Sequence, residues 1–152
     1  MSMSPFTSNR YEDTIEYGKS LGLSLAGGEL IILSGQLGSG KTVITKGIAE
    51  SLRIDEIVTS PSFAIMNLYG GRVNLCHFDF YRIEKKTEME DLLEDYVYRN
   101  ENICVVEWGD PLIDTYESYI HIHIAIDGDT RKISEKRQDF RGGVHMQMGG
   151  AP

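Results

Sequence analysis

The sequence predicts an α/β fold in which short buried strands alternate with helices and antiparallel strands extend a parallel sheet. Two continuous apolar runs, residues 30–33 and 103–106, are typical of strands that are buried on both faces. Directly after the first run, residues 35–42 read G-x-x-x-x-G-K-T, the pattern of a phosphate-binding P-loop. Residues 43–52 then carry apolar side chains at helical spacing. A strand, a glycine-rich loop and a helix in this order predict a P-loop NTPase fold.

Each residue type in the P-loop motif has a chemical task in holding a triphosphate. Its glycines let the backbone fold tightly, with N–H groups directed at a phosphate. Lys41 can reach the β- and γ-phosphates, and the hydroxyl of Thr42 can ligate Mg²⁺. The phosphates then lie at a helix N-terminus, which attracts anions. The loop before the lysine consists of Gly35, Gln36, Leu37, Gly38, Ser39 and Gly40.

The remaining elements follow from apolar periodicity and turn residues. Asn9 and Glu12 have the spacing of a helix cap, and Gly27-Gly28 ends the helix that they open. Gly70-Gly71 separates two extended segments, which predicts a hairpin. In chain order we expect a helix over 11–25, extended segments over 54–59 and 63–69, a strand over 73–80, a helix over 89–98 and a strand over 119–126.

The predicted strand over 119–126 alternates strictly, with four isoleucines on one face. The other face carries His121 and His123. This spacing suits two ligands of a metal ion, but no third ligand is nearby in the sequence. We interpret the segment as a half-exposed strand whose histidines lie on the solvated face.

Length and composition restrict the class of protein. The 152 residues fit one P-loop domain over 1–140, followed by a Gly- and Met-rich tail over 141–152 that we expect to be disordered. A formal net charge of −8 argues against broad, salt-dependent binding of nucleic acid. Cys76 and Cys104 lie in apolar segments without metal-ligand spacing, which predicts buried free thiols. No stretch has membrane-span length and no signal peptide is present, so we expect a cytoplasmic protein without a membrane partner.

Two acids are candidates for catalysis beside Lys41. Transfer of a γ-phosphate needs a carboxylate that holds Mg²⁺ through water and a polar group that orients the nucleophile. Glu107 ends the second apolar run as a Walker B acid would, and Asp79 ends the preceding strand. Either acid can also be a solvated strand end. Residues 60–62, Ser-Pro-Ser, lie where switch segments of P-loop proteins supply hydroxyls, although Ser-Pro alone indicates only a turn.

Four motifs together resemble the TsaE (formerly YjeE) family of bacterial ATPases, over about residues 9–136. They are G-x-L-G-x-G-K-T at 35–42, S-P-S-F at 60–63, H-x-D-x-Y-R at 77–82 and E-W at 107–108. The resemblance implies a three-layer fold with a mixed seven-stranded sheet, and a weak ATPase that uses ATP and Mg²⁺. It further implies that the chain supports threonylcarbamoyladenosine modification of tRNA position 37 by driving turnover of the TsaB–TsaD transferase complex. Contact with tRNA is then indirect, through that complex.

The resemblance assigns roles residue by residue. It implies that Lys41 contacts the phosphates, that Thr42 and Glu107 serve the metal, and that Asp79 lies near the γ-phosphate. Residues implied nearby are Thr14 at the adenine, Arg131 at the nucleotide, Ser60 and Ser62 in a switch-like segment, and Tyr81, Arg82 and Trp108 near the nucleotide or a partner. Departures from the family pattern are Gln36 for Asp, Ser62 for Thr and Leu93 for Gly. Ser62 keeps the hydroxyl, whereas Gln36 removes a charge beside the phosphates.

Three alternatives stay open at this stage. A small-molecule kinase shares the P-loop chemistry, but the sequence has no Arg-rich lid insertion. A GTPase is disfavoured because no N-K-x-D motif is present and the D-x-x-G at 139–142 lies near the C-terminus. In a nucleotide-gated interaction module, hydrolysis is incidental. We expect Asp79 or the 60–62 segment to orient the attacking water, and either a partner or Arg82 to complete the site.

Overall fold

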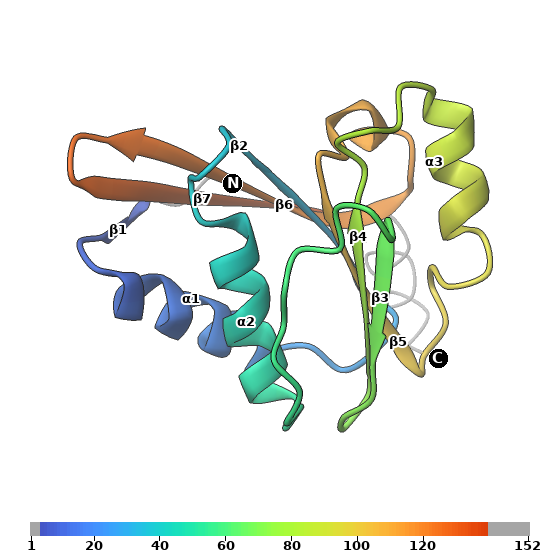
Figure 1. Cartoon of the computed structure of the whole chain (residues 1–152), viewed down its shortest axis with the longest axis horizontal. Helices are drawn as coiled ribbons and strands as arrows, with labels where there is room; N and C mark the ends of the chain where they lie inside the picture. Colours follow the sequence, from blue (N-terminus) through green and yellow to red (C-terminus); the bar gives the residue numbers. More distant parts are fainter. Residues whose placement is uncertain (1–3, 140–152) are drawn as a thin grey trace.

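A computed structural model describes residues 4–139, which form a seven-stranded sheet with helices on both faces (Figure 1). The P-loop connects a central strand to a helix, as the motif predicts. In chain order the elements are β1 (Phe6–Ser8), α1 (Tyr11–Leu23), β2 (Leu30–Gly35), α2 (Lys41–Ser51), β3 (Met66–Tyr69), β4 (Asn74–Asp79), α3 (Lys86–Leu93), β5 (Asn102–Glu107), the 3-10 helix η1 (Asp110–Leu112), β6 (Ser118–Asp127) and β7 (Thr130–Asp139).

The sheet is mixed, as predicted, with strand order β1-β7-β6-β2-β5-β4-β3. The strand before the P-loop, β2, pairs in parallel with both β5 and β6, and β4 pairs in parallel with β5. The outer strands are antiparallel, with β3 against β4, β7 against β6 and β1 against β7. The carboxyl ends of β2, β4 and β5 therefore meet at one edge of the sheet, where ligands bind in open α/β sheets.

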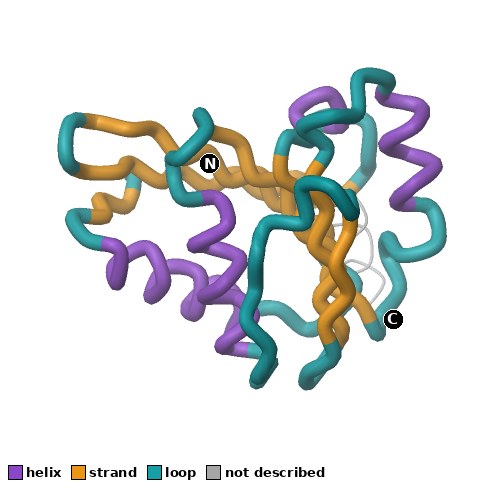
Figure 2. The backbone as a smooth tube through the Cα atoms, in the orientation of Figure 1, coloured by secondary structure: helices purple, strands orange, loops and turns teal. Residues whose placement is uncertain are grey.

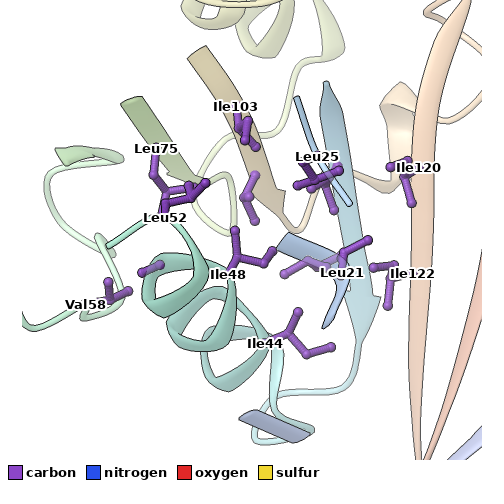
Figure 3. Close-up of a cluster of buried hydrophobic side chains, with 14 of the residues drawn as sticks. Leu21, Leu25, Ile44, Ile48, Leu52, Val58, Leu75, Ile103, Ile120 and Ile122 are labelled. Atoms are coloured by element: carbon purple, nitrogen blue, oxygen red, sulfur yellow. The ribbon is translucent and has the colours of Figure 1, made fainter. Parts of the chain in front are cut away.

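Two hydrophobic cores separate the sheet from its two helix layers. On one face, α1 and α2 pack against β2, β4, β5 and β6; in Figure 3, Ile44 and Ile48 of α2 point at the sheet beside Leu21. On the other face, α3 and η1 cover the alternate side chains of β2, β4 and β5. Each fully buried isoleucine or leucine stabilises the fold by about 1.5–3 kcal/mol. This packing fixes the positions of the strand ends that carry the polar site.

Two glycines let α1 approach α2 closely. A Cβ added at Gly18 would lie 2.3 Å from the carbonyl oxygen of Ile44, and one added at Gly47 would lie 2.2 Å from that of Ile15. These distances are shorter than any real Cβ contact, so each position needs a glycine unless the helices separate. The close contact holds α2, whose N-terminus completes the P-loop, against the first helix.

The start of α1 differs from the prediction. Arg10, not Asn9, occupies the N-cap position, and no side chain caps the helix there. Instead the backbone N–H of Asn9 donates to the carboxylate of Asp13 at 3.0 Å. Asp13 pairs with the guanidinium of Arg10 as well, at 3.2 Å. The first-turn acid at 13 therefore provides the interaction that we assigned to Glu12.

The segment between α2 and β3 is a loop, so the extended segment predicted over 54–59 is wrong (Figure 2). Its apolar side chains Ile54 and Val58 are buried in the core without joining the sheet. The extended segment predicted over 63–69 begins only at Met66, because Ile65 closes a turn by donating its N–H to the carbonyl of Pro61 at 2.6 Å. The hairpin of β3 and β4 across the Gly-Gly turn is confirmed.

The third helix is shifted toward the N-terminus relative to the predicted range 89–98. It spans Lys86–Leu93, and the chain then forms turns up to Tyr98, whose φ is 63°. Leu93 is fully buried as the last residue of α3. The apolar spacing continues beyond the helix because the turn residues Tyr96 and Val97 pack on the same core.

Several other expectations concern the whole chain. Cys76 and Cys104 are buried free thiols, as predicted, and face each other across β4 and β5. The tail predicted over 141–152 lies outside the described residues. Among residues 4–139, no helix has both the length and the apolar character needed to cross a membrane.

Candidate functional site

The P-loop lies between the last residue of β2, Gly35, and the first residue of α2, Lys41. Gly38 and Gly40 have φ angles of 81° and 118°, in the left-handed region where a side chain is strained. Gly40 is also the N-cap of α2, so the loop ends directly on the unpaired N–H groups of the first helical turn. This geometry provides a phosphate-binding loop at a helix N-terminus.

Lys41 is buried and held by the loop itself. Its Nζ donates to the carbonyl oxygens of Gly35 at 2.5 Å and Gln36 at 3.0 Å. The same ammonium lies 4.1 Å from the ring centroid of Trp108, within cation–π range. Burial lowers the pKa of Lys41, and nearby carboxylates, Glu107 first, oppose this shift. A phosphate in the loop would offer the ammonium anionic oxygens in place of two neutral carbonyls.

Glu107, the last residue of β5, is buried between the P-loop helix and β4. Its Oε2 accepts a hydrogen bond from the Thr42 hydroxyl at 2.9 Å. The same oxygen lies 2.6 Å from Nε2 of His77, which is fully buried on β4. Within residues 4–139, Glu107 Oε1 accepts no hydrogen bond. The Walker B-like acid is therefore held by two donors on one oxygen while the other oxygen remains available.

Asp79 ends β4 directly opposite Glu107 in the strand register. Its Oδ1 accepts from the backbone N–H of Tyr81 at 2.9 Å, and its Oδ2 accepts from the Ser60 hydroxyl at 3.0 Å. The hydroxyl of Ser60 is also 3.0 Å from that of Ser62. The loop before β3 thus joins the two hydroxyls of the S-P-S-F motif to the acid of the H-x-D-x-Y-R motif.

The structure brings the central candidates from four separate motifs into one place. They line a cavity of about 520 Å³ at the carboxyl edge of the sheet. One wall is the P-loop with the start of α2, and the opposite wall is formed by the 60–62 loop and the strand ends. Its polar lining residues include Lys41, Thr42, Ser60, Ser62, Asp79 and Glu107.

Apolar and aromatic side chains surround the mouth of this cavity. Tyr81 packs edge-on against Trp108, with ring centroids 4.9 Å apart. Leu37 at the tip of the P-loop is 77% exposed, although it is a large hydrophobic residue. Arg82 also lines the cavity, and its guanidinium carbon lies 4.6 Å from the ring centroid of Phe63, which is 86% exposed. These surfaces can contact either a ligand or another protein.

A second cavity of about 260 Å³ adjoins the first across the P-loop and contains the two remaining predicted residues, Thr14 and Arg131. Thr14 is buried, and its hydroxyl is 2.6 Å from that of Ser8. The guanidinium of Arg131 donates to the carbonyl oxygen of Ser39 at 3.1 Å. These residues connect α1 and β7 to the P-loop, at the position where the rest of a nucleotide would follow its phosphates. Their contact with a nucleotide stays a prediction.

The family model described as threonylcarbamoyl adenosine biosynthesis protein TsaE matches residues 8–137 of this chain. The chain belongs to the TsaE family. The match includes every element of the fold from α1 onward except the last residues of β7. The function named for the family is biosynthesis of threonylcarbamoyladenosine in tRNA.

Individual TsaE proteins and one solved structure are similar over most of the chain. The protein from Treponema pallidum is 33% identical over 121 residues, which are 78% of this chain and 90% of the relative. That from Nostoc sp. is 36% identical over 115 residues, 73% of this chain and 71% of the relative. Both are named tRNA threonylcarbamoyladenosine biosynthesis protein TsaE. The crystal structure of Bacillus subtilis YdiB has a TM-score of 0.76 at 27% identity, covering 97% of this chain and 95% of that chain.

The structure adds His77 to the residues that we selected from the sequence. His77 belongs to the H-x-D-x-Y-R motif, but its position inside an apolar strand is equally typical of a core histidine. One available signal was its spacing from Asp79, since residues two apart on a strand share a face. Contact with Glu107 depends on a pairing 30 residues apart, which spacing alone does not give.

The solvated face predicted for His121 and His123 is only partly correct. His123 is exposed, but His121 is half-buried and its Nε2 lies 2.9 Å from the Ser34 hydroxyl. Ser34 in turn donates to Asp110 at 2.8 Å. Burial lowers the pKa of His121, and the Asp110 carboxylate opposes this shift. Within the described part of the chain, no cluster of three or more metal-ligating side chains forms.

Proposed function

We propose that this TsaE-family chain binds Mg²⁺-ATP in the P-loop cavity and hydrolyses it. Hydrolysis then supports threonylcarbamoyladenosine modification of tRNA by driving turnover of a TsaB–TsaD complex. The observation that carries the proposal is the contact of Thr42 with Glu107 at 2.9 Å, beside Lys41 on the P-loop. It joins the hydroxyl and the carboxylate that P-loop enzymes use around a metal-bound triphosphate.

The residues present suit Mg²⁺, which prefers oxygen ligands. The hydroxyl of Thr42 donates its one proton to Glu107, which leaves both of its lone pairs available. Glu107 lines the cavity, and its Oε1 is also available as a ligand or acceptor. When bound, the ion would neutralise charge that develops on the phosphates. Thr42 would hold it directly, and Glu107 would hold it through water.

Lys41 and the P-loop would bind and orient the triphosphate. The ammonium of Lys41 would donate to phosphate oxygens in place of the carbonyls of Gly35 and Gln36. Hydrogen bonds to the charged phosphate oxygens are stronger than those to neutral carbonyls. The inward N–H groups of the loop and of the first turn of α2 would contact the same phosphates. The second cavity, with Thr14 and Arg131, would hold the nucleoside.

Asp79 and the 60–62 loop would orient the attacking water. Asp79 is an acceptor, and Ser60 has a hydroxyl that can both donate and accept. The water oxygen would bond to the γ-phosphorus while the bond from that phosphorus to the β,γ-bridging oxygen breaks. ADP and inorganic phosphate would then leave, and a proton of the water would be released to solvent. Loss of the γ-phosphate would remove contacts that Ser60 and Ser62 make in the ATP state, so the loop can act as a switch.

Turnover by the isolated chain should be slow, because only Lys41 and Arg82 supply cations among the residues that line the cavity. Arg82 lies against Phe63 at the mouth, so either its movement or a cation from a partner would complete charge neutralisation. The exposed side chains of Leu37 and Phe63 beside the nucleotide are suited to contact with a partner.

The test is phosphate release from Mg²⁺-ATP by the purified chain, alone and with the cognate TsaB–TsaD pair, using Lys41→Ala as the blank. Stimulation by the pair supports the proposal. A rate that ignores the pair but rises with a small metabolite supports a kinase instead. Multiple-turnover tRNA modification that survives in both Glu107→Ala and Asp79→Ala, when neither hydrolyses ATP, would leave only a nucleotide-gated interaction module.

A further inference from the structure

His77 lies beneath the site, on an interior strand of the sheet. It pairs with Asn67 of β3 on one side and with Val105 of β5 on the other, and its side chain has no exposed surface. Its Nε2 contacts Glu107 Oε2 at 2.6 Å. Because the backbone of His77 is paired on both sides and its side chain is fully buried, the imidazole has little freedom to move.

The chemistry of the two groups identifies the donor in the contact between His77 and Glu107. A carboxylate only accepts, so Nε2 of His77 carries the hydrogen and donates it to Glu107. The other ring nitrogen, Nδ1, is buried and has no partner among residues 4–139. A second N–H at Nδ1 would be an unsatisfied buried donor, whereas a lone pair there costs less. The geometry therefore favours the Nε2–H tautomer, with Glu107 as the only polar partner of the ring among residues 4–139.

We propose that His77 is a positioning residue that orients Glu107 for Mg²⁺, an inference that rests on the metal and nucleotide binding proposed above. Thr42 and His77 both donate to Oε2, so the carboxylate cannot rotate without breaking one of two hydrogen bonds. The other oxygen, Oε1, makes no hydrogen bond within residues 4–139, so it would be available to a water on bound Mg²⁺. Outer-shell donors of this kind typically contribute about 10–100-fold to metal affinity or activity.

The consequence differs from that of losing a core residue. Without the His77 donor, Glu107 keeps only Thr42, which is itself assigned to the metal, and the flexible side chain of the glutamate gains freedom. The nucleotide still has the P-loop and Lys41. Metal affinity should therefore fall much more than the affinity for ATP at saturating Mg²⁺.

Two substitutions of similar polarity separate positioning from packing. In His77→Gln the amide nitrogen can take the position of Nε2 and donate to Glu107. In His77→Asn the shorter amide reaches only the position of Nδ1. We expect the Mg²⁺ concentration for half-maximal ATP binding to rise about tenfold in the Asn variant and less than about threefold in the Gln variant. Fluorescence of Trp108, the only tryptophan in the sequence, provides the binding signal.

The comparison is made on the full chain with Mg²⁺ and ATP, with thermal unfolding measured in parallel. Equal Mg²⁺ requirements in wild type and both variants would overturn the proposal. Equal losses in both variants, together with equal losses of stability, would show a packing role and also overturn it. If the Asn variant does not fold, His77→Leu takes its place. A higher Mg²⁺ requirement in His77→Leu, together with the wild-type requirement in His77→Gln, supports the proposal. An unchanged Mg²⁺ requirement in His77→Leu overturns it. The binding measurement does not need hydrolysis, so it stays informative if phosphate release fails with the TsaB–TsaD pair.

Discussion

Asp79 and Glu107 end neighbouring strands, face each other in the register and are buried to a similar degree, yet their surroundings differ. The donors to Glu107 come from rigid elements, Thr42 on α2 and His77 on β4. Those to Asp79 come from the Ser60 loop and from the backbone that follows the strand. One acid is fixed by the core, and the other is connected to a segment without regular structure.

This difference suggests a division of work between the two acids. A metal ligand needs a fixed orientation and an available oxygen, which Glu107 has at Oε1. A group that responds to the γ-phosphate needs a partner that can change position, which Asp79 has in Ser60. We therefore assign Glu107 to the metal and Asp79, with its loop, to the attacking water and the switch.

The largest expected effect comes from removing Lys41, the cation on whose pKa both acids act. In Lys41→Ala, ATP affinity should fall about a hundredfold, since charge-assisted hydrogen bonds contribute about 1.5–3 kcal/mol each. Titration with ATP, followed by calorimetry, measures the loss. Lys46→Ala on the same helix is the matched control, because Lys46 does not line the P-loop cavity. An unchanged ATP affinity in Lys41→Ala would show that the P-loop is not the ATP-binding site.

Glu107→Gln keeps the size of the side chain but removes its charge. We expect kcat for ATP hydrolysis to fall about a hundredfold, while ATP affinity at high Mg²⁺ changes little. Steady-state phosphate release measures this effect, with Glu101→Gln, in the turn directly before β5, as control. Full activity of Glu107→Gln would show that its charge does not serve the metal.

Ser60→Ala removes one donor from Asp79 and leaves the acid in place. A single hydrogen bond contributes about 0.5–1.5 kcal/mol, so we expect kcat to fall about three- to tenfold. Thr59→Ala is the matched control, since Thr59 precedes Ser60 in the same loop, is exposed and does not line the P-loop cavity. A larger loss in the control than in Ser60→Ala would contradict the role of the Ser60–Asp79 contact.

The smallest effect concerns the pH dependence of ATP binding. Burial lowers the pKa of Lys41, and Glu107 opposes this shift more than Asp79 does. Lysine holds phosphate as a cation, so affinity should fall as pH rises through that pKa. In Glu107→Gln the pKa falls further, and affinity should be lost at lower pH than in Asp79→Asn. ATP titrations from neutral pH to about pH 10 test this order of the two variants. Loss of affinity at lower pH in Asp79→Asn than in Glu107→Gln would contradict it.

The sequence predicted the parts of this site that depend on local pattern. The P-loop, its flanking strand and helix, and the acids at two strand ends follow from motifs over a few residues. The resemblance to TsaE motifs supplied the seven-stranded sheet. Long-range side-chain partners did not follow, because the contacts of Glu107 with His77 and of Asp79 with Ser60 depend on strand register and loop path.

The errors in the fold have the same physical origin. Residues 54–59 are partly β-branched, but Ile54 and Val58 bury their side chains from a loop. β-propensity reflects the type of side chain, whereas packing in the core determines whether the backbone joins the sheet. The cap predicted at Asn9 is wrong for a similar reason, because the carboxylate of Asp13 accepts the backbone N–H of Asn9.

The most direct test of the division of work is the Mg²⁺ dependence of ATP hydrolysis in Glu107→Gln and Asp79→Asn, measured side by side with the wild type. We predict a higher half-saturating Mg²⁺ concentration in Glu107→Gln. For Asp79→Asn we predict a lower kcat at an unchanged Mg²⁺ requirement. A shift in Mg²⁺ requirement confined to Asp79→Asn, or equal in both variants, would contradict the assignment.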